Sequence, residues 1–361
     1  MSDPTPTVLD SIRNEIDVID RELVKLLNRR ASLAIEVGKL KGRDGKPFFT
    51  PERERQVFEG LGTINEGPLQ SQQLVSIFRE IVSAARAAEK PLRIAYWGPA
   101  GSFTHLAAER TFGKSSDYEA REDIPDVFQA IERGHCDYGA VPVENSLAGF
   151  VPETVDQFPL TNVRICAEAY LPVHHHLLSL APNLASVKTI YSGPQPTRQC
   201  KRWLAANLPG VQIAEVMPTS RAAQLALEDP ATAAIGNSYT AELLELPILA
   251  EHIEDNRQNQ TRFLIIGYNE PLRTGRDKTT MMFNLRNKPG ELYKALAVYA
   301  NRGIDLMRIE TRPTQRTPFE QVFYLDCRCH KTDAIFMEAL EDLRSQALDI
   351  NVLGSYPIAG E

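Results

Sequence analysis

Residues 8–37 read VLDSIRNEIDVIDRELVKLLNRRASLAIEV, a stretch that contains neither glycine nor proline. Apolar side chains recur through it and just beyond it at helical spacing, at Ile12, Ile16, Ile19, Leu23, Leu26, Leu33, Val37 and Leu40. The spacing predicts one long helix. At a rise of about 1.5 Å per residue this helix would extend about 45 Å, more than the width of a domain of roughly 90 residues. We therefore expect its apolar stripe to pack against a second copy of the chain, in a homodimer or a higher homo-oligomer.

The pattern after this helix divides the chain into three predicted domains. Two shorter helices, expected at 52–61 and 68–89, complete an all-α domain over residues 1–90. Short apolar runs then alternate with amphipathic stretches, which is typical of an α/β domain, here over residues 91–272. Its strands are expected at 93–97, 138–143, 187–191, 211–216 and 263–267.

A polar break at residues 270–278 contains Pro271 and Gly275 and predicts a linker. Beyond it the expected order of elements is βαββαβ, the layout of a ferredoxin-like α+β domain, over residues 277–361. Its strands are expected at 279–285, 304–310, 321–327 and 350–356, and its helices at 290–302 and 332–348.

The composition restricts the class of protein and of partner. The 361 residues carry a formal net charge of −7 and a pI near 5.6, which argues against broad electrostatic binding to nucleic acid or to anionic membranes. The five cysteines are scattered, as in a reducing compartment. Residues 1–7 lack the regions of a signal peptide, and no apolar run reaches the roughly 18 residues of a membrane span. We therefore expect a cytoplasmic protein with neither a membrane nor a nucleic-acid partner.

Three cations lie on or beside the apolar stripe of the long helix: Arg13, Arg30 and Lys41. Burying an unpaired cation costs several kcal/mol even after relaxation, so each of them needs an anion. One interpretation is a set of salt bridges on a helical bundle. The other is a pocket for a small molecule with two negative charges, to which Arg53 and Glu54 of the second helix would contribute.

The second interpretation is favoured because this segment resembles the all-helical chorismate mutase family. The resemblance rests on Ile12-Arg13, Arg29-Arg30-Ala31, the run from Glu36 to Lys41, and Arg53-Glu54-Arg55. It implies that Arg30 and Arg13 clamp the two carboxylates of chorismate, with Arg13 reaching from the partner chain. Lys41 would donate to the ether oxygen. Arg53 would support the pocket, and Glu54 would bind the substrate hydroxyl.

Chorismate rearranges to prephenate in one pericyclic step, without nucleophile, metal or cofactor. Charge separates as the ether C–O bond breaks, so the enzyme holds a compact conformer and places donors on the ether oxygen. Glu89 falls where relatives of the family carry Gln or Glu opposite Lys41. A Glu donates there only when it is protonated, so we expect mutase activity to fall as the pH rises.

Polar clusters lie at the ends of predicted strands in the central domain, at residues 98–104, 142–146, 192–195 and 259–263. Ligands of open α/β sheets bind outside the carboxyl ends of strands, so these clusters are expected to converge. Each alone is weak evidence, because Ser102 and Thr104 of the first cluster could be ordinary helix N-caps. Together and in this order they resemble prephenate dehydratase, whose most distinctive signature is the triplet Thr261-Arg262-Phe263.

This second resemblance implies a two-lobed α/β domain of the periplasmic-binding-protein type that removes carbon dioxide and hydroxide from prephenate. Hydroxide leaves poorly, so a proton donor beside it should accelerate the reaction by about 10² to 10⁴-fold. The family assigns this role to the threonine of the triplet, here Thr261, while Arg262 would fix a carboxylate. The pocket would be completed by Ser102, Thr104, Asn145, Ser146 and Gln195.

Histidines do not enter this prediction as catalysts or metal ligands. Many relatives have His where Gly193 stands, so no histidine role is carried over to that position. The run His174-His175-His176 would lie on a strand, where alternate residues face opposite sides and the three cannot chelate one ion together. We expect structural or substrate-lining roles for them, and neither a metal nor a cofactor.

The βαββαβ segment resembles ACT domains, which pair side by side and bind amino acids at their interface. Two stretches, residues 287–292 and 309–313, are the basis of this resemblance. It implies L-phenylalanine as an allosteric inhibitor, with its carboxylate at a helix N-terminus and its ammonium at a glutamate. The residues expected to hold it are Pro289, Gly290, Leu292, Glu310 and Arg312. A purely structural dimerisation module is the alternative.

Two other functions remain open at this stage. A binding protein or sensor without chemistry would also combine a two-lobed domain with an amino-acid-sensing domain, but Thr261 and the Arg and Lys set match two consecutive steps of one pathway. Arogenate dehydratase is an alternative for the central domain, and the pocket residues do not separate it from prephenate dehydratase. Together, the resemblances imply a bifunctional enzyme of phenylalanine synthesis that acts on chorismate and prephenate.

Overall fold

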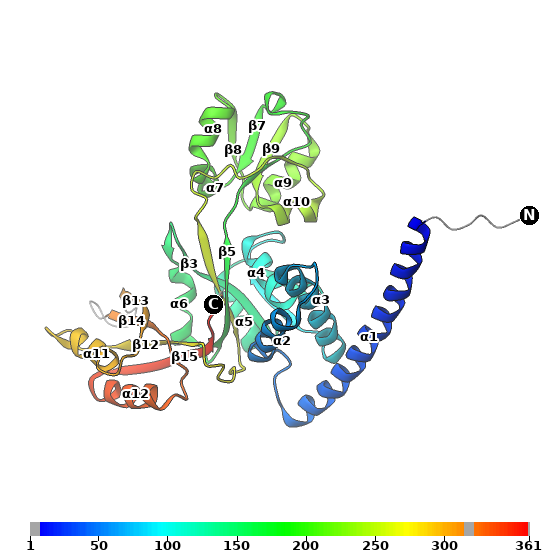
Figure 1. Ribbon diagram of the computed structural model, residues 1–361. Coiled ribbons are helices and arrows are strands. Elements are labelled where there is room, and N and C mark those ends of the chain that lie inside the picture. Colours follow the sequence, from blue (N-terminus) through cyan, green and yellow to red (C-terminus); the bar gives the residue numbers. More distant parts are fainter. Residues whose placement is uncertain (1–7, 314–320, 360–361) are drawn as a thin grey trace, which may run out of the picture. The chain divides into compact units, whose positions relative to one another are not determined.

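The computed structural model describes residues 8–313 and 321–359. Contacts divide the chain into two compact units. The first unit comprises the described residues through Thr50 together with 54–92 and 112–116, and the remaining described residues form the second. Figure 1 traces the elements of both units along the sequence.

Three helices build the first unit: α1 (Val8–Asp44), α2 (Pro51–Ile64) and α3 (Ser71–Glu89). The predicted long helix and two shorter ones are therefore confirmed. Helix α2 opens on Pro51, at a position where the missing N–H of proline has no intrahelical partner to lose. At Gly38 helix α1 comes so close to α3 that an added Cβ would lie 2.9 Å from the Cβ of Glu89. Glycine thus permits the close approach of these two helices.

The apolar stripe of α1 is open in a single chain. Leu23, Leu26 and Leu33 are 49%, 61% and 55% exposed, and Gly38 is the buried residue of this helix. Burying apolar surface stabilises a protein by about 25 cal/mol per Å². An exposed stripe of this length therefore favours a second surface that covers it. Among the described residues, no helix has the length and apolar run that a membrane span requires.

The second unit contains a mixed sheet with the strand order β2-β1-β3-β11-β5, to which β4 adds by pairing with β3. Its strands are β1 (Arg93–Trp97), β2 (Asp117–Arg121), β3 (Tyr138–Asn145), β4 (Gly149–Phe150), β5 (Arg164–Pro172) and β11 (Gln260–Gly267). The accompanying helices are α4 (Phe103–Phe112), α5 (Ile124–Glu132), α6 (Pro152–Val155) and the 3-10 turn η1 (Phe158–Leu160). Strand β11 runs antiparallel to both of its neighbours, β3 and β5.

A second sheet of this unit has the order β10-β6-β9-β7-β8. Its strands are β6 (His176–Leu178), β7 (Thr189–Ser192), β8 (Gln212–Glu215), β9 (Thr232–Gly236) and β10 (Ile248–Ala250). Its helices are α7 (Pro194–Gln199), α8 (Lys201–Asn207), α9 (Thr219–Glu228), α10 (Ser238–Leu244) and the 3-10 turn η2 (Leu184–Ser186). Residues 173–175 connect β5 to β6, and residues 251–259 connect β10 back to β11. Two sheets joined by two such segments form the two-lobed α/β architecture.

The C-terminal part of the second unit has the element order βαββαβ and an antiparallel sheet with the strand order β13-β14-β12-β15. Its elements are β12 (Asp277–Asn284), α11 (Glu291–Ala300), β13 (Leu306–Pro313), β14 (Gln321–Cys327), α12 (Ala334–Gln346) and β15 (Asp349–Pro357). Met281, Phe283, Leu325 and Phe336 are buried in its core. Gly354 of β15 lies against the carbonyl of Ile165 in β5, where an added Cβ would overlap it.

The predicted linker at 270–278 is too long. Strand β12 already begins at Asp277, and Asp277 and Lys278 are 3% and 2% exposed. The polar residues of this stretch led to the prediction of a loop. In the structure, however, the ammonium of Lys278 is buried and paired with Glu168 of β5. The partner lies 110 residues away in the sequence, so the local pattern could not reveal it.

Candidate active sites

The first candidate site lies where the C-terminal part of α1 meets the end of α3. Lys41 Nζ is 3.4 Å from Glu89 Oε2 and 3.3 Å from the carbonyl oxygen of Phe48. The side chains of Lys41 and Glu89 are 20% and 11% exposed. The structure therefore brings together the two residues that were expected to face each other. Because both side chains are largely buried, the charge of one acts on the other more strongly than it would in water.

A buried arginine that the sequence reasoning missed lies close by in the same unit. Arg86 Nη2 is 3.0 Å from Glu54 Oε1, and its side chain is 5% exposed. Its guanidinium also lies 5.4 Å and 5.6 Å from the ring centroids of Phe49 and Phe112. One sequence signal was available, because Arg86 precedes Glu89 by three residues and so shares a face of α3 with it. Arg86 positions the carboxylate that was expected to bind the substrate hydroxyl.

The other predicted mutase residues are spread along the helices. Arg30 Nη1 reaches to 3.4 Å from the carbonyl oxygen of Ile81 in α3. Arg13 is 66% exposed and lies 3.9 Å from Asp10, whereas Arg53 is exposed in the first turn of α2. Along α1, Arg13 and Lys41 are separated by about 42 Å at 1.5 Å per residue. They can touch one small substrate only if they come from different chains.

The second candidate site is formed by the ends of β3 and β11. Thr261 and Asn145 are direct partners in the ladder between these strands. Asn145 Nδ2 donates to Thr261 Oγ1 at 2.9 Å and to Asn259 Oδ1 at 2.8 Å. Because Thr261 Oγ1 accepts this hydrogen bond, its own hydrogen remains available for another acceptor. Ser146 Oγ accepts from the backbone N–H of Gln260 at 2.9 Å, so two of the four predicted clusters do meet.

The first predicted cluster forms the loop before α4. Ser102 Oγ accepts from the backbone N–H of His105 at 3.2 Å, as a helix cap does. Thr104 is buried, with 3% exposed. The carbonyl oxygen of Gly101 accepts from Asn237 Nδ2 at 2.9 Å and from Thr240 Oγ1 at 3.0 Å, two residues at the start of α10. This loop thus touches the lobe that contains the second sheet.

His105 is a buried member of this loop region that the sequence reasoning missed. Its ring stacks on Tyr96 with 4.4 Å between centroids, and its Nδ1 accepts from the N–H of Gly101 at 3.2 Å. Burial lowers the pKa of His105, so the ring stays neutral near pH 7. Its place one turn into α4, three residues after Ser102, was the available signal.

The cluster that includes Gln195 opens α7 in the second sheet's lobe. Gln195 is exposed there. Gly193 is the N-cap of α7, and an added Cβ would lie 2.6 Å from the Sδ of Met217. The thioether lies in the space into which a side chain at Gly193 would project, but Met217 is 70% exposed and its flexible end could move aside.

The structure directs Arg262 away from the predicted substrate site. Neighbouring residues of a strand face opposite sides, so Arg262 points away from the side that Thr261 faces. Its guanidinium donates to Glu168 Oε2 at 2.8 Å, to Asp326 Oδ2 at 2.6 Å and to the hydroxyl of Tyr356 at 2.9 Å, and its side chain is 5% exposed. The expected contact with a substrate carboxylate is therefore replaced by contacts with β5, β14 and β15.

The charge of Arg262 is stable in this buried place. Burial alone would lower the pKa of Arg262, but the field of Tyr356, Asp326 and Glu168 raises it well above its ordinary value. Lys278 Nζ lies 3.0 Å from Glu168 Oε2, so two cations face two carboxylates. We call these four residues, Arg262, Lys278, Glu168 and Asp326, the buried ion cluster.

A second ion pair joins the same two sheets beside the buried ion cluster. Glu144, the ladder partner of Arg262, forms an ion pair with Arg308 of β13. Arg308 Nη2 also lies 2.7 Å from Glu310. Arg312 Nη2 lies 3.3 Å from Asp156. Of the residues expected to hold phenylalanine, Glu310 and Arg312 thus already have partners within this chain.

The remaining residues predicted for phenylalanine lie at the start of α11. Gly290 is its N-cap and has a φ of +85°, a conformation that favours glycine. Pro289 is exposed, and Leu292 is 36% exposed. The predicted residues therefore stand beside the first turn of α11, where the N–H of Glu291 donates to the carbonyl oxygen of Lys288 at 3.3 Å.

The histidine run does not form the predicted strand. Strand β5 ends at Pro172 and β6 begins at His176, so His174 and His175 belong to the segment that connects the lobes. His175 Nε2 lies 2.6 Å from Gln199 Oε1, and burial lowers the pKa of His175. A structural role for this residue agrees with that geometry.

Comparisons with known proteins define the class. The family model of chorismate mutase type II matches residues 12–90, and that of prephenate dehydratase matches residues 94–271. A solved prephenate dehydratase from Arthrobacter aurescens, in complex with L-Phe, superposes with a TM-score of 0.68 at 32% identity and covers 74% of this chain and 90% of its own. A solved structure described as the quorum quenching acylase GqqA gives a TM-score of 0.67 at 27% identity and covers 74% and 98%. The fold and sites define a helical mutase fused to a two-lobed α/β dehydratase.

Full-length relatives combine both parts. The bifunctional chorismate mutase/prephenate dehydratase of Aquifex aeolicus is 41% identical over 97% of this chain and 98% of its own length. That of Stutzerimonas stutzeri is 40% identical over 97% and 98%. This chain belongs to the family of bifunctional chorismate mutase/prephenate dehydratases, and chorismate and prephenate are its substrates.

Gly38→Ala should lower mutase activity about tenfold or more. Alanine would strengthen α1 by about 1 kcal/mol of helix propensity, but its Cβ would push α1 away from Glu89. Small displacements of catalytic groups are costly, up to about 100-fold per Å. Mutase kcat/KM is the measurement. Gly60→Ala is the matched control, since nothing lies within 4 Å of a Cβ there. Equal kinetics in both variants would contradict the importance of the close approach of α1 and α3 at Gly38.

Proposed function

We propose that Lys41 and Glu89 act on chorismate, that Thr261 acts on prephenate, and that L-phenylalanine regulates the second reaction. The domains proposed for these tasks are residues 1–90, 91–272 and 277–361. The observation that supports the dehydratase assignment best is the Asn145–Thr261 hydrogen bond at 2.9 Å, because it leaves the threonine hydroxyl free to donate. A related fold is described as an acylase, so the reaction is argued from the site and not from the fold.

In the dehydratase reaction the hydroxyl of Thr261 would donate to the departing hydroxide. A hydroxyl is a feeble acid, so Thr261 holds the leaving group or hands on a proton, and Asn145 keeps its oxygen in place. Ser146, Ser102, Thr104 and Gln195 are proposed to line the pocket. Because Ser102 caps α4 and Gln195 opens α7 in the other lobe, the proposed pocket would lie between the two lobes.

In the mutase reaction Lys41 and a protonated Glu89 would both donate to the ether oxygen of chorismate. Arg30 and Arg53 would act from the same chain and Arg13 from a partner chain. The exposed stripe of α1 and the separation of about 42 Å between Arg13 and Lys41 both support a dimer. Arg86 would hold Glu54 ready for the substrate hydroxyl.

Regulation would pass through the ladder between β3 and β11. The pair Thr261 and Asn145 faces the dehydratase pocket, and the next pair, Arg262 and Glu144, faces the C-terminal sheet. There Arg262 binds Asp326 and Glu144 binds Arg308. If the C-terminal sheet shifts when L-phenylalanine binds, it would move Arg262 and Glu144. These residues are adjacent in sequence to Thr261 and Asn145, so the shift would reach the pocket. The solved relative in complex with L-Phe supports the choice of ligand.

Thr261→Ala should lower dehydratase kcat by about 10² to 10⁴-fold, because the donor beside the leaving group is lost. Thr261→Ser, which keeps a hydroxyl, is the matched variant and should retain most of the activity. Phenylpyruvate formation from prephenate is the measurement, and mutase turnover of the same samples is the control for folding. Dehydratase turnover within a few-fold of wild type in Thr261→Ala would contradict the assignment.

Glu89→Gln should flatten the fall of mutase activity at higher pH. The wild-type carboxyl donates only while it is protonated, whereas the amide donates at every pH. The measurement is the pH profile of mutase kcat/KM for the wild type and the variant. Identical profiles for the two proteins would remove Glu89 from the mechanism.

Arg308→Met should weaken inhibition by L-phenylalanine at least about fivefold, the lower end of typical allosteric couplings. The change removes the ion pairs with Glu144 and Glu310 and keeps an aliphatic side chain over Phe150. Dehydratase activity without effector should stay within about threefold of wild type. Inhibition can weaken because L-phenylalanine binds less tightly or because its binding no longer affects the dehydratase site. Calorimetry separates these causes, because only in the second case does L-phenylalanine still bind as it does to the wild type. Arg328→Met, which removes an exposed pair with Asp305, is the control.

A further inference from the structure

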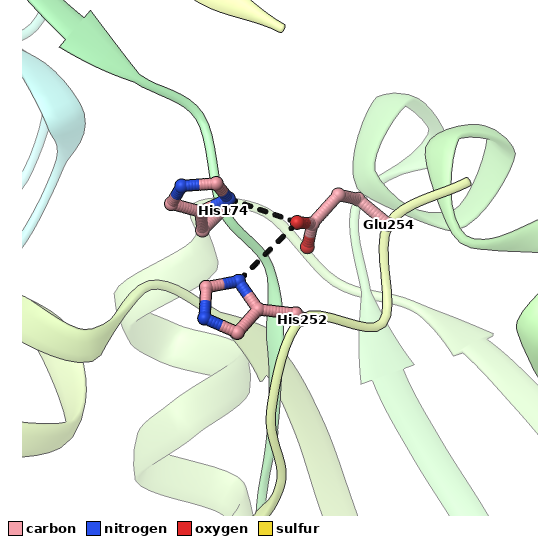
Figure 2. Close-up of side chains that lie close together, drawn as sticks. All are labelled: His174, His252 and Glu254. Carbon is pink, nitrogen blue, oxygen red and sulfur yellow. Dashed lines mark hydrogen bonds and ion pairs between the residues drawn. The ribbon is translucent and has the colours of Figure 1, made fainter. Parts of the chain in front are cut away.

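His174, His252 and Glu254 lie together on the two segments that connect the lobes (Figure 2). His174 Nδ1 is 2.8 Å from Glu254 Oε1, and His252 Nδ1 is 3.4 Å from the same oxygen. One ligand atom from each residue falls within 4.8 Å of the other two. His174 belongs to residues 173–175, whereas His252 and Glu254 belong to residues 251–259.

Glu254 is fixed in the protein interior and faces both rings. Its side chain is 2% exposed, and its Oε2 accepts from the backbone N–H of His175 at 2.9 Å. A buried carboxylate oriented by a backbone hydrogen bond is a typical preformed ligand.

His252 has features that packing alone does not explain. Its Nδ1 is buried and makes no hydrogen bond, although it faces Glu254. Its φ is +52°, a left-handed conformation that costs a residue with a side chain about 1 kcal/mol or more. Its own N–H donates to His176 Nδ1 at 3.3 Å, so that nitrogen of His176 is occupied. The strained backbone therefore holds this ring nitrogen, which makes no hydrogen bond, 3.4 Å from an oxygen of Glu254.

The donor set indicates the chemistry of the ligand. Two imidazole nitrogens and one carboxylate suit zinc, cobalt or nickel, whereas magnesium and calcium prefer oxygen ligands alone. Atoms bound at about 2.1 Å to one ion lie about 3 to 4 Å apart, so shifts of side chains suffice to form the site. His174 and His252 are 31% and 40% exposed, which leaves a route for the ion and positions for water.

We propose that His174, His252 and Glu254 bind one divalent transition-metal ion of the zinc, cobalt or nickel kind, which ties the two connecting segments together. Imidazole binds a metal ion only when the ligating nitrogen carries no proton, so binding should weaken as the pH falls. This proposal is independent of the residue roles proposed for the two reactions.

Cobalt titration of the untagged, full-length protein tests the proposal. We expect one Co²⁺ per chain by calorimetry, with visible absorption bands typical of nitrogen and oxygen ligands, and a higher Tm with the metal. Glu254→Gln and His252→Asn should weaken binding at least about tenfold, and asparagine tolerates the left-handed backbone at this position. His135→Ala changes an exposed histidine in the lobe that contains β1 and β3, and this variant should bind Co²⁺ as the wild type does.

Three outcomes would overturn the proposal. One is the absence of saturable binding at pH 8, and another is unchanged binding in His252→Asn. The third is a thiolate charge-transfer band, which would place the ion at one of the five cysteines. Near-wild-type circular dichroism and mutase turnover of each variant show that a lost signal is not a loss of folding.

Discussion

The buried ion cluster is the constraint on which the second unit depends. Arg262 and Lys278 face Glu168 and Asp326, and all four side chains are at most 5% exposed. Charges out of water are tolerated only when each has a partner, and removing one partner of such a pair costs about 3 to 5 kcal/mol. That is a large share of a typical domain stability of about 5 to 15 kcal/mol. The dehydratase sheet and the C-terminal sheet are thus held together by charges that cannot be lost singly.

The period of a β-strand turns this constraint into a functional arrangement. Successive residues face opposite sides, so Thr261 and Arg262 serve two different surfaces although they are adjacent. The same holds for Asn145 and Glu144 on the neighbouring strand, in register with them. A one-residue slip would exchange the two surfaces, and the ion pairs to β13 and β14 oppose it. The register that places the hydroxyl is therefore fixed partly by charges on the other side of the sheet.

Sequence alone predicted the features that are encoded locally. The spacing of apolar residues gave the long helix, and the short apolar runs gave β1, β3 and β11. It failed where remote segments decide the environment of a polar residue. Strand β5 was missed because Glu168 looks like a surface residue until Arg262 and Lys278 are placed beside it, and Lys278 was taken for part of a linker for the same reason. His174 and Glu254 are 80 residues apart, so no local pattern joins them.

The division into two units also bears on what an effector can reach. Lys41 and Glu89 belong to the first unit, and Thr261 and Asn145 to the second. An effector alters an activity only through contacts that differ between two states. Within the second unit, ion pairs join β14 and β13 to Arg262 and Glu144, which directly neighbour Thr261 and Asn145 in the chain. A ligand that shifts the C-terminal sheet would therefore act on the two strands that carry Thr261 and Asn145, whereas control of the mutase would require separate contacts with α1 or α3.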